Sequence, residues 1–355
     1  MSPRRVAFVL PSFAGGGSER VILTLLAGLD RDRFAPSLIV LHNDGPLTAL
    51  VPGDVTVHDL ARPRLRGALP ALARTIRRLA PVTVVSSLGY VNLGLLALRP
   101  LLPTTARLVV REANTPSQSL PRSRWPLATW FGYRLRYPTA DAVLCQHDRT
   151  ASEMRDRFGV PDSRIHRLDN PVDVAGLRAK ATPRREPGPG PRFVAAGRLT
   201  RQKGFDRLLP MIARLPAAHL TILGDGPDRA ALDREAQTLG VGDRVRLSGF
   251  EPNPWAWYAG ADACLVPSRW EGMPNAALEA LACGAPVIAM AEAGGIAELA
   301  ARSDAVTVAA DTEAFEAAMA AVTPAPATEP RPSRLPAEYE AATVVAEFEK
   351  IIGGL

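Results

Sequence analysis

Lysine is the scarcest charged residue in this chain. The 355 residues include 42 basic side chains, of which only Lys180, Lys203 and Lys350 are lysines, so the other 39 are arginines. A lysine at a random surface position is therefore unusual here. A lysine that stands inside a motif indicates a specific chemical need.

Cysteine is equally scarce, and metal-binding patterns are missing. The three cysteines are scattered in apolar surroundings without metal-ligand spacing, which predicts buried thiols and neither a disulfide nor a metal site. No Asp-x-Asp pair ends a strand, so a metal-bridged diphosphate is not indicated, and no Gly-x-Ser-x-Gly elbow is present. We therefore expect no metal and no cofactor.

Long apolar runs are absent as well. No apolar stretch reaches transmembrane length without a charge or a proline. The N-terminal apolar run is too short for a signal peptide and lacks a small-residue cleavage site, so we interpret Val6–Leu10 as a buried strand. These features, with the buried thiols, predict a cytoplasmic protein.

The net charge of +6 is unevenly distributed along the chain. Residues 1–182 hold 25 basic and 14 acidic side chains, a net +11, whereas residues 183–355 hold 17 and 22, a net −5. A basic first half favours an anionic partner, and an anionic membrane surface is one such partner. A genome rich in arginine on solvated faces is the alternative, which explains the arginines but explains their segregation less well.

Apolar strand-like runs alternate with helical segments along the whole chain, which predicts an α/β fold with parallel sheets. We expect two doubly wound Rossmann-like domains that face each other across a cleft. The expected strands are Val6–Leu10, Ser37–Leu41, Val82–Ser86, Arg107–Val110 and Ala142–Leu144, then Phe193–Ala196, His219–Leu223, Val245–Ser248, Ala263–Val266 and Pro286–Ala289.

Two proline-rich segments divide the chain. Residues 182–192 contain four prolines and two glycines, which predicts a linker, and residues 323–336 predict a loop. The expected domains are therefore residues 1–182, which would bind the acceptor, and residues 183–336, which would bind a nucleotide sugar. A last helix near residues 337–351 is long enough to pack back on the first domain.

Residues 268–290 carry the strongest functional signal. Glu271 and Glu279 bracket a turn of Gly272, Met273, Pro274 and Asn275 that leads into a helix. Free backbone N–H groups at such a turn suit a phosphate, and carboxylates beside it suit hydroxyls. A phosphate next to a polyhydroxyl group describes a nucleotide sugar. Complementarity to the helix dipole is the alternative, but it does not explain the turn.

A second motif follows the first strand of the second half. Residues 197–204 offer Arg198 and Lys203 at the carboxyl end of a strand, where open α/β sheets bind ligands. Arginine can hold two phosphate oxygens and lysine supplies a point charge. Gly224 and Gly226 end another strand of this half, where their backbone would line a nucleotide pocket.

Glycines also follow the first strand of the chain. Gly16 and Gly17 precede a helix, which suits a phosphate approaching the backbone. The segment is not Gly-x-Gly-x-x-Gly, which weakens a dinucleotide interpretation. An ordinary turn with Ser18 as the N-cap is equally consistent with these residues.

Polar residues at two strand ends of the first half are candidates for acceptor contacts, with strand-end capping as the alternative. They are Tyr90, Asn92, Arg111, Glu112 and Asn114. Residues 122–137 mix arginines with Trp125, Trp130 and Phe131, which suits a membrane interface, although an internal helix with half-buried aromatics is favoured somewhat more. No nucleic-acid motif accompanies this mixture, so no nucleic-acid partner is expected.

Taken together, the motifs closely resemble those of the retaining glycosyltransferases of family 4, which have the two-domain GT-B fold. The matching segments, in family order, are residues 15–20, 170–173, 197–204, 223–227 and 271–279. The pair of glutamates in the last segment is the most specific of them. The segments span nearly the whole chain.

The resemblance implies transfer of a hexose or N-acetylhexosamine from a nucleotide diphosphate sugar, without metal and with retention. It implies that Arg198 and Lys203 bind the diphosphate, that Glu271 holds the donor sugar and that Glu279 holds the ribose. Gly16 and Gly17 would approach the phosphate from the first domain. A UDP-sugar is favoured over a GDP-sugar.

The family frequently has a histidine where the sequence here reads Arg111-Glu112-Ala113-Asn114, so that histidine's contact has no direct counterpart. The acceptor is expected to be a saccharide or a lipid-linked saccharide in cell-surface glycan synthesis, at the inner face of the membrane. Two alternatives remain open from sequence. They are a nucleotide-sugar epimerase of the same fold and a non-catalytic saccharide- or nucleotide-binding protein.

Overall fold

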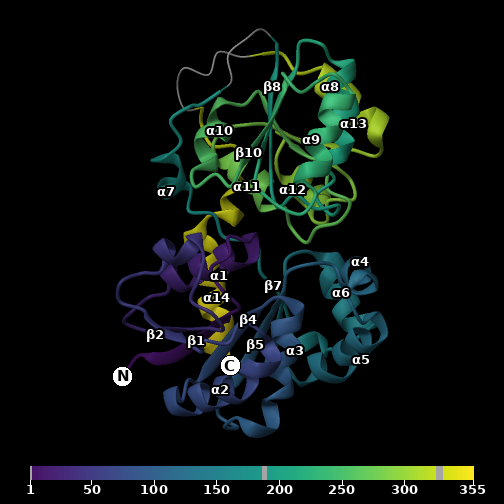
Figure 1. Ribbon diagram of the computed structural model, residues 1–355. Coiled ribbons are helices and arrows are strands. Elements are labelled where there is room, and N and C mark those ends of the chain that lie inside the picture. The colour runs from purple at the N-terminus through teal and green to yellow at the C-terminus, as the bar shows by residue number, and fades with distance from the viewer. Residues whose placement is uncertain (1, 186–189, 325–330) are drawn as a thin grey trace. The chain divides into compact units, whose positions relative to one another are not determined.

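The computed structural model describes residues 2–185, 190–324 and 331–355 (Figure 1). Both proline-rich segments therefore lie partly outside the described residues. The chain forms two compact units, one made of Met1–Pro171 with Ala341–Leu355 and the other of Val172–Glu340. Each unit contains one fully parallel sheet with helices on both faces, and the predicted pair of doubly wound α/β domains is confirmed.

The first unit contains a seven-stranded sheet of order β3-β2-β1-β4-β5-β6-β7. Alternate residues of β1 enter different cores, with Val6 and Phe8 on one face and Ala7 and Val9 on the other, as expected for a strand covered on both sides. The strands are β1 Arg4–Leu10, β2 Phe34–Val40, β3 Thr56–Asp59, β4 Thr83–Ser87, β5 Arg107–Glu112, β6 Ala142–Cys145 and β7 Ile165–Arg167.

Helices of the first unit cover both faces of its sheet. One core unites β1 with residues of α1 and α14, and the other unites the sheet with residues of α2, α3, α5 and α6. The helices are α1 Gly17–Gly28, α2 Leu65–Leu79, α3 Gly89–Ala97, α4 Pro116–Ser119, α5 Pro126–Arg136, α6 Asp148–Asp156 and α14 Ala341–Gly354.

The second unit contains a six-stranded sheet of order β10-β9-β8-β11-β12-β13. Its two cores lie on opposite faces of the sheet, one with α7, α10, α11 and α12 and the other with α8, α9 and α13. The strands are β8 Arg192–Ala196, β9 His219–Leu223, β10 Val245–Gly249, β11 Ala263–Val266, β12 Val287–Met290 and β13 Val306–Ala309. The helices are α7 Val174–Arg178, α8 Leu208–Arg214, α9 Arg229–Thr238, α10 Pro254–Gly260, α11 Asn275–Ala282, α12 Ile296–Arg302 and α13 Thr312–Ala320.

The last helix, α14, belongs to the first unit. Phe348 is fully buried and its ring lies 6.1 Å from that of Phe8. Glu349 accepts hydrogen bonds from the backbone of Asp30 at 2.7 Å and from Arg33 at 2.7 Å. Gly28 provides the close approach, because an added Cβ would lie 2.7 Å from Val345.

The division between the units lies earlier in the chain than the proline-rich segment at 182–192. The backbone of Val172 donates to Tyr339 at 2.8 Å, and Leu177 and Ala181 are part of a core of the second unit. The segment that follows Pro171 is therefore part of the second unit, because it buries apolar surface there.

Three strands were not expected from the sequence: β3, β7 and β13. All three lie at sheet edges; β3 and β7 have no buried residue, and in β13 only Val306 and Ala309 are buried. An edge strand can cover less apolar surface than a central one, and these three sequences lack a continuous apolar run; the fourth edge strand, β10, was predicted. None of the helices in the described parts of the chain is both long enough and apolar enough to cross a membrane.

Candidate functional site

The order of strands in the second unit creates a switch point between β8 and β11. The chain continues from β8 toward one edge of the sheet and from β11 toward the other. Ligands of open α/β sheets bind at such a point, outside the carboxyl ends of the strands. Two loops meet there, residues 197–204 after β8 and residues 267–274 after β11, and we call them the switch-point loops.

Hydrogen bonds join the two switch-point loops. The backbone of Arg269 donates to the carbonyl of Gln202 at 2.8 Å, and the Gln202 amide donates to the carbonyl of Trp270 at 3.0 Å. The Arg269 guanidinium holds both carboxylate oxygens of Asp206, at 2.7 and 2.6 Å. This hydrogen-bonded guanidinium holds the pKa of Asp206 below its usual value. The two loops are thus held together as one site.

Lys203 and Glu271 meet where the loops join. The Lys203 ammonium forms an ion pair with Oε1 of Glu271, and the Ser268 hydroxyl donates to the same oxygen at 2.9 Å. Glu271 is only 6% exposed, so its charge requires these partners. Lysine carries three N–H donors, and its ammonium can therefore serve a second acceptor beside Glu271. Two of the residues predicted as catalytic are brought into direct contact.

Glycine is required where the first switch-point loop turns. Gly204 has φ +70° and lies so close to β11's loop that an added Cβ would be 2.2 Å from the carbonyl oxygen of Pro267. At Gly197, φ is +152° and an added Cβ would lie 3.1 Å from the side chain of Lys203. The two glycines therefore allow the loops to approach each other and the Lys203 side chain to lie against Gly197, just after β8.

Glu279 lies on α11, one turn beyond the second loop. Its carboxylate accepts a hydrogen bond from the indole of Trp255 at 3.1 Å. Trp255 belongs to α10 and is buried against α11. The indole fixes the direction of this carboxylate, a role that sequence reasoning did not assign to Trp255. An indole N–H on a helix next to a carboxylate-bearing helix gives no local sequence pattern.

The turn that precedes α11 is hydrogen-bonded to the segment that follows β12. The carbonyl of Gly272 accepts from the backbone of Gly295 at 2.7 Å. Met273 and Pro274 are buried, and Asn275 is the half-buried first residue of α11. The first turn of α11 directs its N–H groups to the same end of the sheet as the switch-point loops, which suits a bound anion.

The end of β9 lies beside the first switch-point loop. Gly224 donates its backbone N–H to Gly249 at 2.7 Å, and Leu199 donates to Asp225 at 3.0 Å. An added Cβ at Gly226 would lie 2.4 Å from the carbonyl of Leu199. The two glycines predicted at this strand end are therefore part of the same cluster of loops.

Arg198 differs from its neighbours because its side chain is exposed. It forms no ion pair within the described part of the chain. Its guanidinium projects from the loop that also carries Lys203. A cation kept at a ligand-binding edge without a protein carboxylate is suited to an external anion.

The first unit has its own switch point, between β1 and β4. The Ser18 hydroxyl lies 2.7 Å from that of Ser87, and Arg111 donates to them at 3.3 and 3.2 Å. Helix α1 begins at Gly17 with Gly16 at the N-cap position, and no side chain caps it. The interpretation of Ser18 as the N-cap is therefore wrong, because its hydroxyl bonds across the switch point instead.

Arg111 is buried, with 1% of its surface exposed, and donates to the side chain of Asn170 at 2.5 Å. Burial lowers the pKa of Arg111 to about 10. Asn170 follows β7 and was recognised in sequence only as part of a motif. The guanidinium thus ties the ends of β4, β5 and β7 together with α1.

Glu112 is buried as well and is held by two tyrosines of α5 and the turn after it. Tyr133 donates to its carboxylate at 2.9 Å, and Tyr137 donates to the same oxygen in a short contact. Burial raises the pKa of Glu112, and these hydrogen bonds oppose the shift only in part. The two tyrosine rings stack 4.3 Å apart.

The remaining acceptor candidates divide into buried and accessible residues. Asn92 is fully buried and bonds to Ser86 at 2.8 Å and to the carbonyl of Arg111 at 2.9 Å. Tyr90 is 52% exposed and Asn114 is half-buried. Tyr90 and Asn92 lie on α3 and not in a loop at the strand end, because the chain enters a helix at Gly89 directly after β4.

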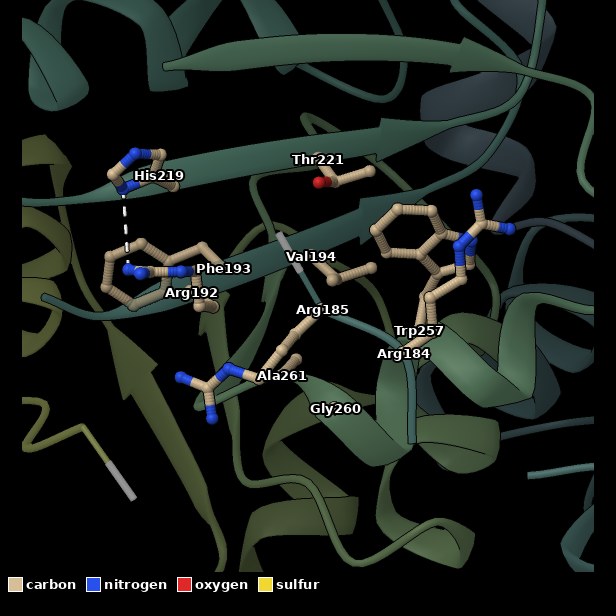
Figure 2. A pocket seen from close by; sticks show the side chains of 10 residues that line it. All are labelled: Arg184, Arg185, Arg192, Phe193, Val194, His219, Thr221, Trp257, Gly260 and Ala261. Atoms are coloured by element: carbon tan, nitrogen blue, oxygen red, sulfur yellow. Dashed lines mark hydrogen bonds between the residues drawn. The ribbon is translucent and has the colours of Figure 1, made fainter. Parts of the chain in front are cut away.

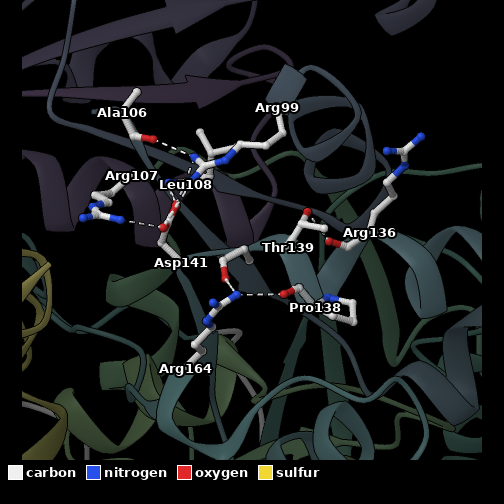
Figure 3. Close-up of polar contacts among 10 residues, drawn as sticks. Arg99, Ala106, Arg107, Leu108, Arg136, Pro138, Thr139, Asp141 and Arg164 are labelled. Atoms are coloured by element: carbon white, nitrogen blue, oxygen red, sulfur yellow. Dashed lines mark hydrogen bonds and ion pairs between the residues drawn. The ribbon is translucent and has the colours of Figure 1, made fainter. Parts of the chain in front are cut away.

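The opposite, amino ends of the strands are fixed by aspartates. Asp141 precedes β6, accepts from the backbone of Leu108 at 2.8 Å and pairs with Arg99 at 3.1 Å and Arg107 at 3.2 Å (Figure 3). Asp262 precedes β11 and accepts from the backbone of Arg192 at 2.7 Å. Both aspartates join the starts of neighbouring strands, so their role is structural.

A small hollow in the second unit also lies at the amino ends of strands. It is lined by residues that include Arg192 at the start of β8, His219 at the start of β9, and Trp257 (Figure 2). The Arg184 guanidinium stacks over the Trp257 ring at 4.3 Å. This hollow is at the opposite end of the sheet from the switch-point loops and is separate from the candidate site. Among the described residues, no group of three or more His, Cys, Asp or Glu could hold a metal ion.

Comparison with known proteins connects these features with a family. Residues 190–323 match the family model described as "Glycosyl transferases group 1", and residues 15–175 match the model described as "Glycosyltransferase Family 4". The two matched segments together span most of the chain and include the switch-point loops of the second unit and Ser18, Ser87 and Arg111 of the first.

Individual relatives agree with the family models. The N-acetylgalactosamine-N,N'-diacetylbacillosaminyl-diphospho-undecaprenol 4-alpha-N-acetylgalactosaminyltransferase of Campylobacter jejuni is 26% identical over 307 residues, 83% of each chain. The lipopolysaccharide core biosynthesis glycosyltransferase LpsE of Rhizobium meliloti is 36% identical over 108 residues, 30% of this chain and 32% of the relative.

Solved structures agree on the fold. HepE of Anabaena, in complex with UDP-glucose, superimposes with a TM-score of 0.77 at 16% identity, covering 99% of this chain and 100% of HepE. The fold is thus that of the two-domain GT-B glycosyltransferases. With both halves of the chain matched and the fold shared, this protein belongs to the family 4, group 1 glycosyltransferases.

Proposed function

We propose that this glycosyltransferase transfers a hexose or an N-acetylhexosamine, with retention, from a nucleotide diphosphate sugar to a saccharide or lipid-linked saccharide. The observation that carries the proposal is the contact between Lys203 and the buried Glu271 at the switch point of the second unit. A diphosphate needs cations, and a sugar needs acceptors for the hydrogen bonds that its hydroxyls donate. Lys203 supplies a cation, and Glu271 supplies an acceptor.

Each residue at the switch point has a proposed role. Lys203 and the exposed Arg198 bind the diphosphate and stabilise the charge that develops on it as it leaves, the task that a metal performs in other enzymes. The backbone N–H groups of Gly272, Met273 and Asn275 support the same phosphates, since Pro274 carries no N–H. Glu271 accepts hydrogen bonds from the donor sugar, and Glu279 from the ribose. Gly224 and Gly226 line the nucleotide. The approach of Gly16 and Gly17 to the phosphate remains a prediction from the sequence.

We propose that the acceptor hydroxyl attacks the anomeric carbon on the face from which the diphosphate departs. The bond from that carbon to the phosphate oxygen breaks, the bond to the acceptor oxygen forms, and the departing oxygen takes the acceptor's proton. Configuration is then retained without a nucleophile from the protein. A cation next to the departing oxygen lowers the barrier, which is the role given to Lys203.

The proposed substrates rest on the relatives. The relative of Campylobacter is named for a diphospho-undecaprenol acceptor, and the relative of Rhizobium for lipopolysaccharide core biosynthesis. HepE was solved with UDP-glucose. We therefore favour a UDP-sugar donor and an acceptor of cell-surface glycan synthesis, bound at the inner face of the membrane. Among the acceptor candidates, Tyr90 and Asn114 are accessible. We propose that the buried Asn92, Arg111 and Glu112 hold the residues around the acceptor in place.

A donor screen with matched variants tests the proposal. Thermal-shift measurements with UDP, GDP, ADP and their sugars should show selective stabilisation, because a ligand that binds only the folded state stabilises by mass action. Lys203→Ala and Glu271→Ala should abolish transfer to the acceptor while the circular dichroism spectrum is unchanged. Lys350→Ala and Glu347→Ala, on exposed residues of α14, serve as the controls and should transfer normally.

Other outcomes would identify a different function. Full turnover by either switch-point variant would refute the site. An epimerised sugar released from the donor without any acceptor would indicate an epimerase. Donor binding by calorimetry without transfer to any member of an acceptor panel would indicate a binding protein.

A further inference from the structure

Helix α5 presents an apolar stripe on its outer face. Leu127, Phe131 and Leu135 follow at intervals of four residues and are 77%, 56% and 69% exposed, and Trp125 just before the helix is 61% exposed. Residues four apart lie on one face of a helix. Four of the eight large apolar side chains that are exposed in the described chain therefore gather on this one short segment.

The other face of α5 fixes the helix to its unit. Tyr133 is buried and bonded to Glu112. The ring of Trp130 lies 6.3 Å from that of Phe158, and Gly132 allows the side chain of Leu93 to approach. The interpretation as an internal helix with half-buried aromatics thus applies to this inner face only. Because the inner face is anchored, the apolar stripe cannot turn inward.

Arginines border the stripe. Arg124, Arg134 and Arg136 are exposed and form no ion pair with the described residues. Figure 3 shows the Arg136 side chain directed away from the neighbouring contacts, with only its backbone carbonyl engaged, by Thr139. No acidic residue stands between Glu112 and Asp141 in the sequence. The segment therefore joins apolar surface with uncompensated positive charge.

We propose that α5 is a membrane-binding element that lies in the interface of an anionic phospholipid bilayer. Trp125, Leu127, Phe131 and Leu135 would enter the boundary between headgroups and acyl chains, and the arginines would contact lipid phosphates. An amphipathic helix with an apolar face and bordering arginines binds in this way. The purpose of this contact rests on the proposed function, since a lipid-linked acceptor is held in the bilayer, but the contact itself does not.

A second copy of the chain fits this surface less well. A two-fold interface brings the same patch of both subunits together, so the arginines of one helix would face those of the other. A stable dimer also buries roughly 1,200–2,000 Å² in total. One helix with four exposed apolar side chains is a small contribution to that area. An anionic bilayer satisfies both the charge and the apolar stripe.

Vesicle binding tests the proposal directly. The full chain is sedimented with vesicles of phosphatidylcholine alone and of phosphatidylcholine with one-quarter phosphatidylglycerol, without any sugar nucleotide. We expect binding to the anionic vesicles, a loss of binding as salt rises, and a blue shift of tryptophan emission that Trp125→Phe reduces. The double variant F131E/L135E should bind at least roughly tenfold more weakly, since two apolar side chains no longer enter the bilayer.

Matched controls come from the second unit. Leu239→Glu changes an exposed leucine of that unit and Arg234→Gln an exposed arginine, and both should bind vesicles like the unmodified chain. Arg134→Gln with Arg136→Gln should weaken binding to anionic vesicles only. Because Phe131 and Leu135 are exposed, F131E/L135E should keep its melting temperature, which verifies that it is folded.

Three results would overturn the inference. They are no binding of the unmodified chain to anionic vesicles, an equal loss with Leu239→Glu, or a dimer in light scattering that F131E/L135E converts to a monomer. The last would make α5 an interface between copies. A thermal-shift measurement with UDP-sugars on the same samples separates the two proposals. If the unmodified chain binds no donor, the proposed function is refuted, and the vesicle result is unaffected.

Discussion

At the scale of single residues, the candidate site depends on groups that hold the charged side chains in place. Glu271 is directed by Lys203 and Ser268, and Glu279 by Trp255. In the first unit, Glu112 is held by two tyrosines. A carboxylate that accepts hydrogen bonds from substrate hydroxyls binds the substrate more tightly when its orientation is fixed before binding. Substitution of the supporting residues should therefore affect function, as substitution of the carboxylates should.

Trp255→Phe should weaken nucleotide binding. The substitution keeps an aromatic ring in the core but removes the indole N–H that directs Glu279. A hydrogen bond to a charged group contributes about 1.5–3 kcal/mol, so we expect KM for the donor to rise by roughly tenfold or more, with a smaller change in kcat. Steady-state kinetics over a range of donor concentrations measures both values.

Trp257→Phe is the matched control for that prediction. Its indole donates to Glu251 at 3.1 Å and not to Glu279, and its ring lines the hollow at the amino ends of the strands. An equal rise in KM with both variants would mean that the effect is a general loss of packing and not a loss of direction at Glu279.

Glu112→Gln should change how stability depends on pH. Burial raises the pKa of Glu112 in the folded chain, so above the ordinary carboxyl pKa the folded state retains a proton that the unfolded state has lost. Stability from this group is therefore complete below the ordinary pKa and decreases as pH rises through the raised pKa. Glutamine has no such proton, so the variant should gain stability relative to the unmodified chain as pH rises from about 4.

Urea unfolding of both proteins across a pH series measures this difference. Glu347→Gln, at an exposed position on α14, is the control and should show no comparable trend. A difference between Glu112→Gln and the unmodified chain that stays constant with pH would contradict a buried, proton-retaining carboxyl at this position.

At the scale of elements, α14 completes a core to which it is remote in sequence. Val344, Val345, Phe348 and Ile352 are buried with residues of α1 and β1. The sequence predicted such a helix and its return to the first half only from its length. Its start is later than expected, because residues 337–339 form a separate turn that stays with the second unit.

Phe348→Ala should destabilise the first unit by about 3–5 kcal/mol, the usual cost of truncating a buried phenylalanine. Chemical unfolding followed by circular dichroism measures the loss, and Glu347→Ala on the exposed face provides the comparison. A change below about 1 kcal/mol would mean that α14 is not an integral part of this core.

At the scale of the whole molecule, two sheets with separate cores predict two unfolding transitions. UDP should raise only the transition of the second unit, by about 2.7 kcal/mol in stability at one hundred times its Kd. Scanning calorimetry with and without UDP, on the unmodified chain and on Phe348→Ala, assigns the transitions. If UDP raised the transition that Phe348→Ala lowers, the nucleotide would not bind chiefly to the second unit.

The sequence by itself determined the α/β class, the central strands and the loops that carry Lys203 and Glu271, because buried parallel strands need continuous apolar runs and turns need glycine and proline. Three of the four edge strands, β3, β7 and β13, were not predicted, since they lack a continuous apolar run. Only the tertiary structure decided that Lys203 contacts Glu271, that Trp255 directs Glu279, that Arg111 and Asn92 are buried, and which face of α5 is exposed. These facts depend on strand order and on which helix packs beside which. Such contacts join residues far apart in the chain, and no local pattern encodes them.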